Sequence, residues 1–131
     1  MHSGPVRRDD RSAGFFDGAA RGELMLRRCP SCSAWYGPDA RGCPDCPGTE
    51  PGWAASAGTG TLVSWVVAHG RPGPDGATPE PDVAGLVELA EGPWMTAAVE
   101  APAAELRAGL PLRARFERPS EGEPYPVFVG S

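Results

Sequence analysis

The chain has 131 residues, with 18 glycines, 16 prolines and a formal net charge of −5, and this length allows one modest domain and a small appendage. It contains no lysine, asparagine, glutamine or isoleucine, so a Schiff base on a lysine of this chain is excluded. An acidic protein is also a poor general binder of phosphate backbones, although a local basic patch stays an alternative. The longest apolar stretch, near residues 62–68, is far too short to span a bilayer.

The N-terminal segment is polar before it becomes helical. Residues 1–11 are rich in arginine and aspartate, which predicts a disordered leader or the remnant of a linker. Ser12 is a candidate cap for a short helix that carries Phe15 and Phe16 and ends near Gly22. Adjacent phenylalanines cannot both face one narrow contact. They either pin the helix to its own domain, which is the commoner role of large apolar side chains, or one of them docks a partner.

The four cysteines of the chain form two pairs with two-residue spacers: Cys29, Cys32, Cys43 and Cys46. Ten residues separate Cys32 from Cys43, a loop long enough for a hairpin and too short for a domain. Two such pairs are typical of a zinc ribbon, in which each pair forms a turn that places both thiolates on one face. We expect one Zn²⁺ held by four thiolates. Because no coordination position stays open, the metal is predicted to be structural rather than catalytic.

Disulfides and a redox-active dithiol are the competing interpretations of the cysteines. Disulfides need an oxidising compartment, and the start of the sequence lacks the apolar core of a signal peptide. A redox dithiol is a single Cys-x-x-Cys pair, whereas this sequence has two across one hairpin. The sequence therefore favours zinc and a cytoplasmic location.

Short strands are predicted on either side of the first cysteine pair, at residues 23–28 and 34–36. A ribbon this small has almost no core of its own, so metal binding is expected to supply most of its folding free energy, on the order of 10 kcal/mol. Trp35 and Tyr36 on the return strand either cover the metal site, the commoner arrangement, or present a surface. Residues 47–52 have the composition of a linker.

The second half of the chain predicts five strands, at residues 60–69, 83–90, 94–100, 112–117 and 125–129. The first strand has apolar residues on both faces and is expected to be mostly buried. The Pro/Gly-rich residues 70–82 predict a loop that is either disordered or used for binding, and residues 91–93 predict a hairpin turn. Residues 103–107 are expected to form one helical turn.

Five strands with a helical turn between the third and fourth suit a small closed barrel of the OB type, because closure removes exposed sheet edges. The predicted fold class is therefore mostly β: a short N-terminal helix plus a zinc ribbon, followed by a five-stranded OB-fold barrel. The predicted organisation is a leader at residues 1–11, the helix and zinc ribbon at 12–52, and the barrel at 53–131.

No catalytic motif accompanies these elements. Every cysteine is assigned to the metal, and His2 and His69 are the sole candidate imidazole bases. The sequence has no Gly-x-Ser-x-Gly elbow, glycine-rich phosphate loop or His-Glu-x-x-His run. His69, at a strand end, is more often a local hydrogen-bonding residue, and we assign it no role. The sequence therefore predicts a binding protein rather than an enzyme.

The order of these elements resembles a family of two-part proteins with an N-terminal rubredoxin-like zinc ribbon and a C-terminal OB-fold, often found beside thiolases in acyl-CoA metabolism. The resemblance covers about residues 12–130. It is carried by the helix with Phe15 and Phe16, the strand 23–28, both cysteine pairs, the segments 60–62, 83–89 and 109–112, and Gly92. The ribbon alone is generic, but this order of elements is specific.

This resemblance implies a non-catalytic partner of a thiolase-like aldolase. Family members bind thiolase-like enzymes that act on bulky acyl-CoA thioesters, and some are fused behind an enoyl-CoA hydratase domain. In steroid side-chain degradation such a domain recruits an aldolase that cleaves the hydrated thioester by a retro-aldol reaction. By this resemblance the chain is either an excised domain or a free-standing subunit, with two copies expected around an enzyme dimer. Phe15, Phe16, Trp35 and Tyr36 are the candidate partner contacts.

Two alternatives stay open beside that role. Zinc ribbons and OB barrels also bind single-stranded nucleic acid, and Arg113 and Arg115 share one strand face while Arg27, Arg28 and Arg41 lie near the ribbon. Because the protein is acidic and no aromatic residue alternates with those arginines, a solvated charged face is the preferred interpretation, and nucleic-acid binding is not expected. The second alternative is direct binding of CoA, with Arg113 and Arg115 meeting its phosphates.

Overall fold

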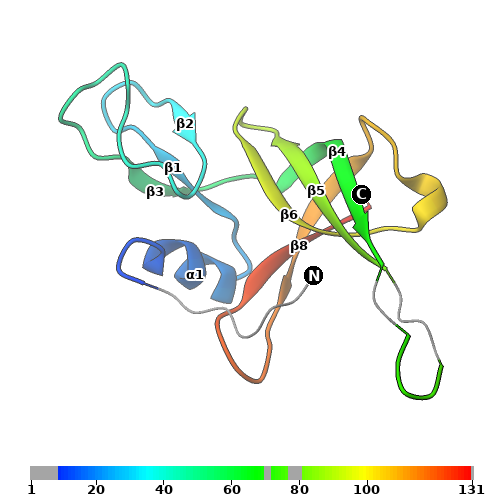
Figure 1. Cartoon of the computed structure of the whole chain (residues 1–131). Coiled ribbons are helices and arrows are strands. Elements are labelled where there is room, and N and C mark those ends of the chain that lie inside the picture. Colours follow the sequence, from blue (N-terminus) through cyan, green and yellow to red (C-terminus); the bar gives the residue numbers. More distant parts are fainter. Residues whose placement is uncertain (1–8, 70–71, 77–80, 131) are drawn as a thin grey trace.

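A computed structural model describes residues 9–69, 72–76 and 81–130 of the chain. Residues 1–8 of the predicted leader, residues 70–71 and 77–80 of the predicted loop, and residue 131 lie outside the described part. The elements, in chain order, are α1 (Ala13–Ala20), β1 (Met25–Arg28), β2 (Trp35–Tyr36), β3 (Gly52–Ala55), β4 (Thr59–Ala68), β5 (Asp82–Leu89), β6 (Trp94–Glu100), the 3₁₀ turn η1 (Ala103–Glu105), β7 (Pro111–Glu117) and β8 (Tyr125–Gly130). In Figure 1, α1 and the small sheet of β1, β2 and β3 lie at one end and the barrel at the other. This arrangement confirms the predicted fold class.

Helix α1 begins after Ser12, as predicted, but Ser12 does not cap it with its side chain. The Ser12 hydroxyl instead lies 3.0 Å from a carboxylate oxygen of Asp9, within a turn that precedes the helix. At the other end, the amide of Gly22 donates to the carbonyl of Ala19 at 3.0 Å, and Gly22 has φ +81°. Glycine adopts this left-handed conformation without strain and so ends the helix. No helix in the described part of the chain is long and apolar enough to cross a membrane.

Helix α1 packs directly on β1. Phe16, Gly18 and Ala19 are its buried residues. A Cβ at Gly18 would lie 2.0 Å from Cγ of Met25, so the methionine side chain occupies the space that any larger residue would need. The close approach of helix and strand therefore requires glycine at this position.

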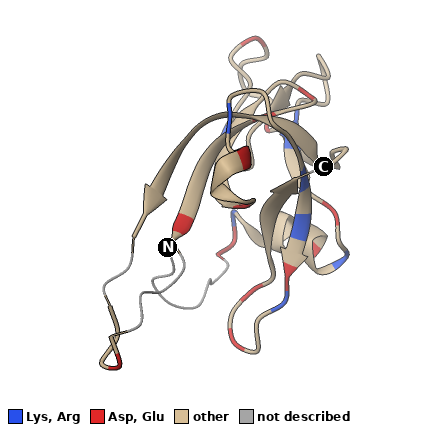
Figure 2. Ribbon diagram, turned by 90° about the vertical axis from the view of Figure 1, so that its right-hand side faces the viewer, with Lys and Arg blue, Asp and Glu red and all other residues tan. Residues whose placement is uncertain are grey.

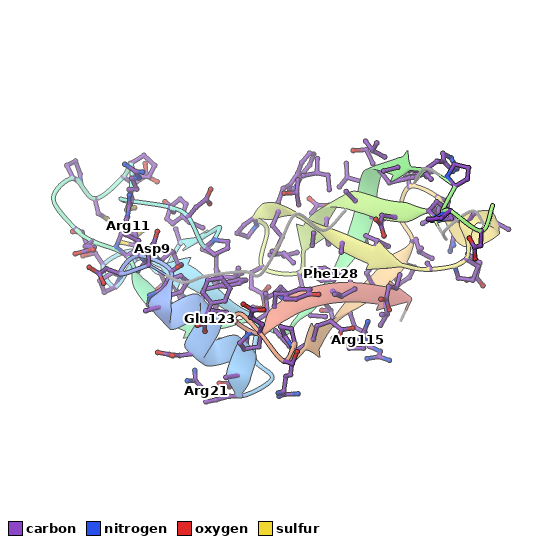
Figure 3. The ribbon with its side chains drawn as sticks, turned by 60° about the horizontal axis from the view of Figure 1, so that its bottom comes forward. Asp9, Arg11, Arg21, Arg115, Glu123 and Phe128 are labelled. Atoms are coloured by element: carbon purple, nitrogen blue, oxygen red, sulfur yellow. The ribbon has the colours of Figure 1, made fainter. Side chains whose placement is uncertain are left out.

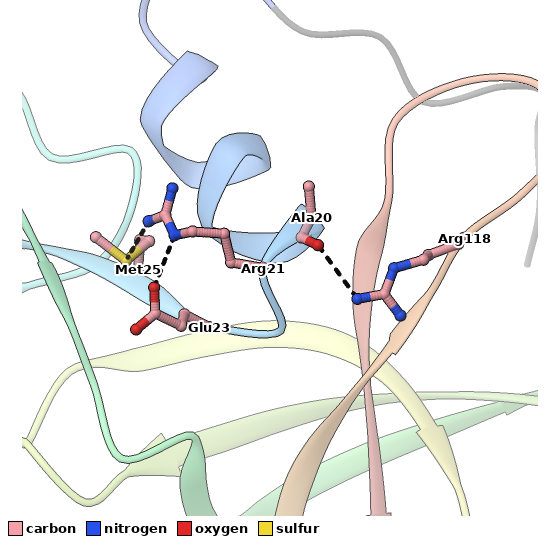
Figure 4. A network of polar contacts seen from close by, with 5 residues as sticks. All are labelled: Ala20, Arg21, Glu23, Met25 and Arg118. Atoms are coloured by element: carbon pink, nitrogen blue, oxygen red, sulfur yellow. Dashed lines mark hydrogen bonds and ion pairs between the residues drawn. The ribbon is translucent and has the colours of Figure 1, made fainter.

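Polar contacts connect the end of α1 to both parts of the molecule (Figure 4). Arg21 forms a 2.8 Å ion pair with Glu23 and lies 3.8 Å from the sulfur of Met25 on β1. Arg118, which follows β7, donates to the carbonyl of Ala20 at 3.2 Å. This last bond satisfies one of the free carbonyls at a helix C-terminus and joins the helix to the barrel.

The small sheet has the order β2-β1-β3, and both pairings are antiparallel. Strand β2 is the predicted return strand of the ribbon. Strand β3 is additional, because the sequence predicts a linker up to residue 52 and no strand at residues 52–55. In the structure β3 pairs with β1 along its whole length, from Met25 opposite Ala55 to Arg28 opposite Gly52. The chain thus returns to the ribbon sheet before it enters the barrel.

The barrel closes in the order β4-β5-β6-β8-β7, with β7 pairing back onto β4. All pairings are antiparallel except that of β6 with β8, which is parallel. The five strands match the five predicted ones, and η1 lies between the third and fourth, as expected. The β5–β6 hairpin turns at the predicted residues 91–93, where the amide of Gly92 donates to the carbonyl of Leu89 at 2.9 Å.

One hydrophobic core runs through the barrel and into the ribbon. Phe128 on β8 is 0% exposed, and Figure 3 places it on the inside of the barrel while Arg115 points outward. Leu24 and Leu26, from the segment that leads into the ribbon, belong to the same cluster. The cluster comprises Leu24, Leu26, Leu62, Val87, Leu89, Val99, Leu110, Leu112 and Phe128. Although the ribbon has little core of its own, it contributes two leucines to the core of the barrel.

The prediction that residues 60–69 form a mostly buried strand is wrong in one respect. Strand β4 is long, but Leu62 is its one buried residue, and Val66 is 69% exposed. A bulge between Leu62 and Ser64 shifts the register against β5. In a single-layer barrel the second face of a strand points to solvent, so apolar residues on both faces of β4 do not indicate burial on both sides.

Candidate metal centre and binding surfaces

The two cysteine pairs form two turns that face each other. In the first, the amide of Cys29 donates to the carbonyl of Ala34 and the amide of Ser33 donates to the carbonyl of Cys29, each at 2.9 Å. Ser33 has φ +65°, a left-handed conformation unusual for a residue other than glycine. In the second, the amide of Cys46 donates to the carbonyl of Cys43 at 3.2 Å. These bonds close both turns and bring each pair of thiols to one side.

The four sulfur atoms lie within 4.8 Å of one another, although two of them come from the first turn and two from the second. A tetrahedral Zn²⁺ with bonds of about 2.3 Å places its sulfurs about 3.8 Å apart. Sγ of Cys32 and Sγ of Cys43 are 3.6 Å apart, which suits this geometry and is far longer than a disulfide bond of about 2.05 Å. All four cysteines are free thiols. The site therefore fits one zinc ion, as the sequence predicts.

Within each turn of the metal site, the two cysteines differ in burial. Cys29 is 1% exposed and Cys43 is 5% exposed, whereas Cys32 is exposed at the surface. Each turn therefore contributes one shielded sulfur, and the first also contributes one that solvent can reach.

Tyr36 is the residue of the return strand that contacts the metal site. Its hydroxyl oxygen lies 3.2 Å from Sγ of Cys43. This hydrogen bond lowers the pKa of the Cys43 thiol to about 7, because the phenol donates to the thiolate. The same bond, followed by burial, raises the pKa of Tyr36. Before zinc binds, hydrogen bonding to Cys29, followed by burial, raises the pKa of Cys46 to about 12. The four sulfurs therefore have unequal surroundings.

Trp35, the second candidate on the return strand, packs against the hydrophobic core. The guanidinium of Arg28 lies 4.5 Å from the centre of its ring, a cation–π contact. Trp35 is half-buried, so one part of its ring stays accessible. The structure thus places Tyr36 beside the cysteine cluster and Trp35 between the core and the surface.

Phe15 and Phe16 lie in different surroundings despite being adjacent. Phe16 is 8% exposed and belongs to the buried side of α1. Phe15 is half-buried and meets Phe16 edge to face, with ring centres 5.2 Å apart. Phe15 also lines an open hollow of about 290 Å³, together with residues of the 9–12 turn, Arg27 and residues 38–41. Of the two, Phe15 is the one that a partner can reach.

Arg113 and Arg115 share the outer face of β7, as the sequence predicts, but their environments differ. Arg115 forms ion pairs with Glu117 and, with a smaller effect, Glu100, which raise the pKa of the guanidinium. Two carboxylates against one guanidinium leave this cluster with a net negative charge. Arg113 is exposed, and the described residues provide no ion pair for it. Arg113 is therefore the better candidate for an anionic ligand.

Two surface residues that the sequence did not single out are the exposed large apolar side chains of the described residues. Val66 on β4 is 69% exposed and Trp94 at the start of β6 is 53% exposed. The Trp94 indole donates to a carboxylate oxygen of Glu88 at 3.2 Å. Strand β4 has no charged residue, and Figure 2 shows it without blue or red along its length. The sequence did contain a signal for the exposure of Val66, because apolar residues stand on both faces of the 60–69 segment.

Two family descriptions match consecutive parts of the chain. Residues 16–52 match "ChsH2, rubredoxin-like zinc ribbon domain". Residues 53–117 match "ChsH2, C-terminal OB-fold domain". The first match contains all four cysteines, and the second contains four of the five barrel strands.

Two solved structures share the fold. A chain of the structure described as "Ltp2-ChsH2(DUF35) aldolase" is 28% identical and superimposes with a TM-score of 0.79, over 94% of this chain and 96% of that chain. A protein of unknown function of the DUF35 family from Sulfolobus solfataricus is 12% identical and superimposes with a TM-score of 0.63, over 93% of this chain and 86% of that chain. At this low identity the second structure shows the fold alone.

A curated relative shares part of its sequence with the chain. The "Probable enoyl-CoA hydratase alpha subunit" of Thermomonospora curvata is 37% identical over 87 residues, which are 66% of this chain. They are 26% of that protein, so the chain spans about a quarter of the relative's length. The two family matches run without a gap from residue 16 to residue 117, and the clustered cysteines and closed barrel agree with both. The chain belongs to the ChsH2 family of zinc-ribbon and OB-fold proteins.

Proposed function

We propose that the chain is a non-catalytic partner of a thiolase-like aldolase that acts on acyl-CoA thioesters, by retro-aldol cleavage in steroid side-chain degradation. The observation that carries the proposal is the likeness to the chain of the "Ltp2-ChsH2(DUF35) aldolase", which covers 94% of this chain and 96% of that one. Because both the ribbon and the barrel are included, the likeness extends to the arrangement of the whole molecule.

The chain's own residues support a binding role. Four thiolates complete the coordination of one zinc ion, which leaves no position for a substrate or an activated water. The sequence has no lysine, and His69, one of its two histidines, is exposed at the end of β4. In this proposal the aldolase supplies the catalytic groups, and this chain completes the complex.

The test is co-expression with candidate thiolase-like aldolases, followed by size-exclusion chromatography and a retro-aldol assay on a β-hydroxyacyl-CoA. We expect the two proteins to co-elute and the complex to cleave the thioester, while this chain alone releases no product. Cleavage by the purified chain alone contradicts the proposal, as does failure to bind any member of the aldolase panel.

The proposed contacts with the aldolase come from the ribbon end, at Phe15, Phe16, Trp35 and Tyr36. Of these, Phe15 and Trp35 are half-buried, Phe16 is buried and Tyr36 bonds to a metal ligand, so we expect Phe15 and Trp35 to contribute most. Phe15→Ser should weaken aldolase binding at least tenfold in a titration by calorimetry. Val66→Ser, which removes an apolar side chain from the surface of the barrel, is the matched control. Equal binding by the wild type and Phe15→Ser contradicts this placement.

A second proposal is direct contact with CoA at the outer face of β7. Arg115 is neutralised by two carboxylates, so Arg113 is the guanidinium we propose for a CoA phosphate. Calorimetry with free CoA, with the wild type and Arg113→Ala, tests this contact. Equal heats for both proteins contradict it. The same neutralisation makes binding of single-stranded DNA unexpected, and a salt-dependent mobility shift with such DNA is the result that favours that alternative.

We also propose a neighbouring enzyme, a stoichiometry and a cellular location for the complex. The relative from Thermomonospora curvata is named an enoyl-CoA hydratase subunit, so we propose that this chain acts beside a hydratase, by fusion or in a complex. We further propose two copies of the chain with two of the aldolase. Four cysteines that bind zinc as thiolates suit a reducing compartment, which supports our proposal of a location in the cytoplasm.

A further inference from the structure

One side chain outside the four ligands touches the metal site through a hydrogen bond. The hydroxyl oxygen of Tyr36 lies 3.2 Å from Sγ of Cys43, a normal separation for a hydrogen bond to sulfur. In the described part of the chain, every other side-chain hydrogen bond at these sulfurs comes from another cysteine of the cluster. Tyr36 is therefore the candidate outer-sphere residue of this site.

The position of Tyr36 explains how it can reach across the site. It ends β2, where it is paired with Arg27 of β1, and it lies seven residues before Cys43 in the chain. The bond therefore connects the ribbon sheet, which leads into the first cysteine pair, to the turn that holds the second pair. Because Cys43 is 5% exposed, water has little access to this sulfur and cannot readily replace the phenol as a donor.

The negative charge of the site strengthens this hydrogen bond. Four thiolates around one Zn²⁺ carry a net charge of about −2, and this charge is partly buried. A hydrogen bond to a charged acceptor is roughly twice as strong as one between neutral groups. Removing an outer-sphere partner of a metal ligand typically lowers metal affinity 10- to 100-fold.

We propose that Tyr36 is a positioning residue of the zinc centre: its hydroxyl donates to the Cys43 thiolate and thereby slows loss of the metal and fixes the second turn against the ribbon sheet. The inference is independent of the aldolase role, because it concerns the metal centre of the isolated chain. Because the Tyr36 hydroxyl bonds within the ribbon, any contact of Tyr36 with a partner is left to its ring.

Zinc release from Tyr36→Phe tests the proposal. The variant keeps the ring and removes the donor, and Tyr125→Phe removes the same group from β8 as a matched control, Tyr125 being the chain's second tyrosine. Transfer of zinc to an excess of a coloured chelator should be about tenfold faster for Tyr36→Phe than for the wild type. The control should release zinc at the wild-type rate. A Tyr36→Phe rate equal to that of the control overturns the proposal.

A spectroscopic readout separates hydrogen bonding from packing. In the Co²⁺-substituted protein, loss of a hydrogen bond raises the energy of the thiolate electrons, so the sulfur-to-cobalt charge-transfer band should move to longer wavelength in Tyr36→Phe. Tyr36→Leu also lacks the hydroxyl and should show a shift of the same sign, although it packs differently. Faster metal release without any band shift would mean that Tyr36 acts through packing, and this result also overturns the proposal.

Discussion

The ribbon and the barrel are two β structures that are stabilised in different ways. The ribbon sheet is small, and β2 has two residues. Its buried side chains near the metal are two of the cysteines, and its leucines, Leu24 and Leu26, pack in the barrel core. The barrel is a closed five-stranded ladder with its own apolar interior. The comparison indicates that the metal orders the ribbon, burial of apolar side chains orders the barrel, and the two leucines couple them.

The largest effect is expected at the metal. Cys43→Ser removes a buried ligand, and binding of a structural zinc ion is worth on the order of 10 kcal/mol to a ribbon of this kind. The zinc content of the purified variant should fall well below one per chain, and the amide NMR signals of the ribbon should collapse while those of the barrel strands persist. A full zinc complement and an unchanged ribbon spectrum would contradict the account of the site.

The corresponding substitution in the barrel is Phe128→Ala. Phe128 is 0% exposed at the centre of the core, and truncation of such a residue typically costs about 4 kcal/mol. Chemical denaturation should show a loss of this size. The folded fraction of the variant should keep its zinc, because no cysteine lies in the barrel. Loss of zinc from the folded protein would show that the two regions are not separately stabilised.

The junction between the regions is tested by Leu26→Ala. Leu26 is 0% exposed and belongs to the common core, so its truncation should cost about 3 kcal/mol. Unlike Phe128→Ala, it should both lower the unfolding midpoint and speed zinc release, because Leu26 lies on a ribbon strand and packs in the barrel core. Ala54→Gly, a small change on β3 opposite Leu26, is a control that leaves the core volume intact. An effect on one readout without the other would argue against coupling.

A much smaller effect is expected on the outer face of the barrel. Arg115→Met removes the ion pairs with Glu100 and Glu117, but the Arg115 side chain is 35% exposed and solvent screens such pairs. The free energy of unfolding should fall by about 1 kcal/mol or less, and this difference should shrink in high salt. Arg113→Met, on the same face without such pairs, should change stability still less.

The smallest effect is a pH dependence at the N-terminal turn. Hydrogen bonds from the hydroxyl and amide of Ser12 hold the pKa of the Asp9 carboxyl below its usual value. The turn is therefore fully favoured above about pH 4 and is lost as the pH falls through the lowered pKa. The amide NMR shift of Ser12 should report this transition, and Asp9→Ala should abolish it. A transition of Asp9 above its usual pKa would contradict these hydrogen bonds.

The sequence predicts the features that depend on local pattern. The paired cysteines specify the metal site, and the alternation of apolar residues together with Gly92 specifies the β5–β6 hairpin. Features that depend on tertiary contact are not visible in one sequence. Strand β3 forms because residues 52–55 pair with the free edge of β1, and their composition gives no sign of this pairing.

Side-chain roles that depend on tertiary contacts are likewise not visible in the sequence. The phenol of Tyr36 reaches Cys43 because the hairpin folds back, which sequence spacing alone cannot establish. Exposure of Val66 follows from closure of a single-layer barrel, in which one face of each strand must meet solvent. Pairing of Arg115 with Glu100 joins strands that are brought together by that closure.

Sedimentation velocity of this chain mixed with its candidate aldolase shows directly whether the two proteins assemble. We expect a single faster species that contains two copies of each protein, and its formation should require the zinc-loaded chain. If the two proteins sediment independently for every aldolase tested, or if the Cys43→Ser variant joins the complex as tightly as the wild type, the account of this chain as a zinc-dependent partner is contradicted.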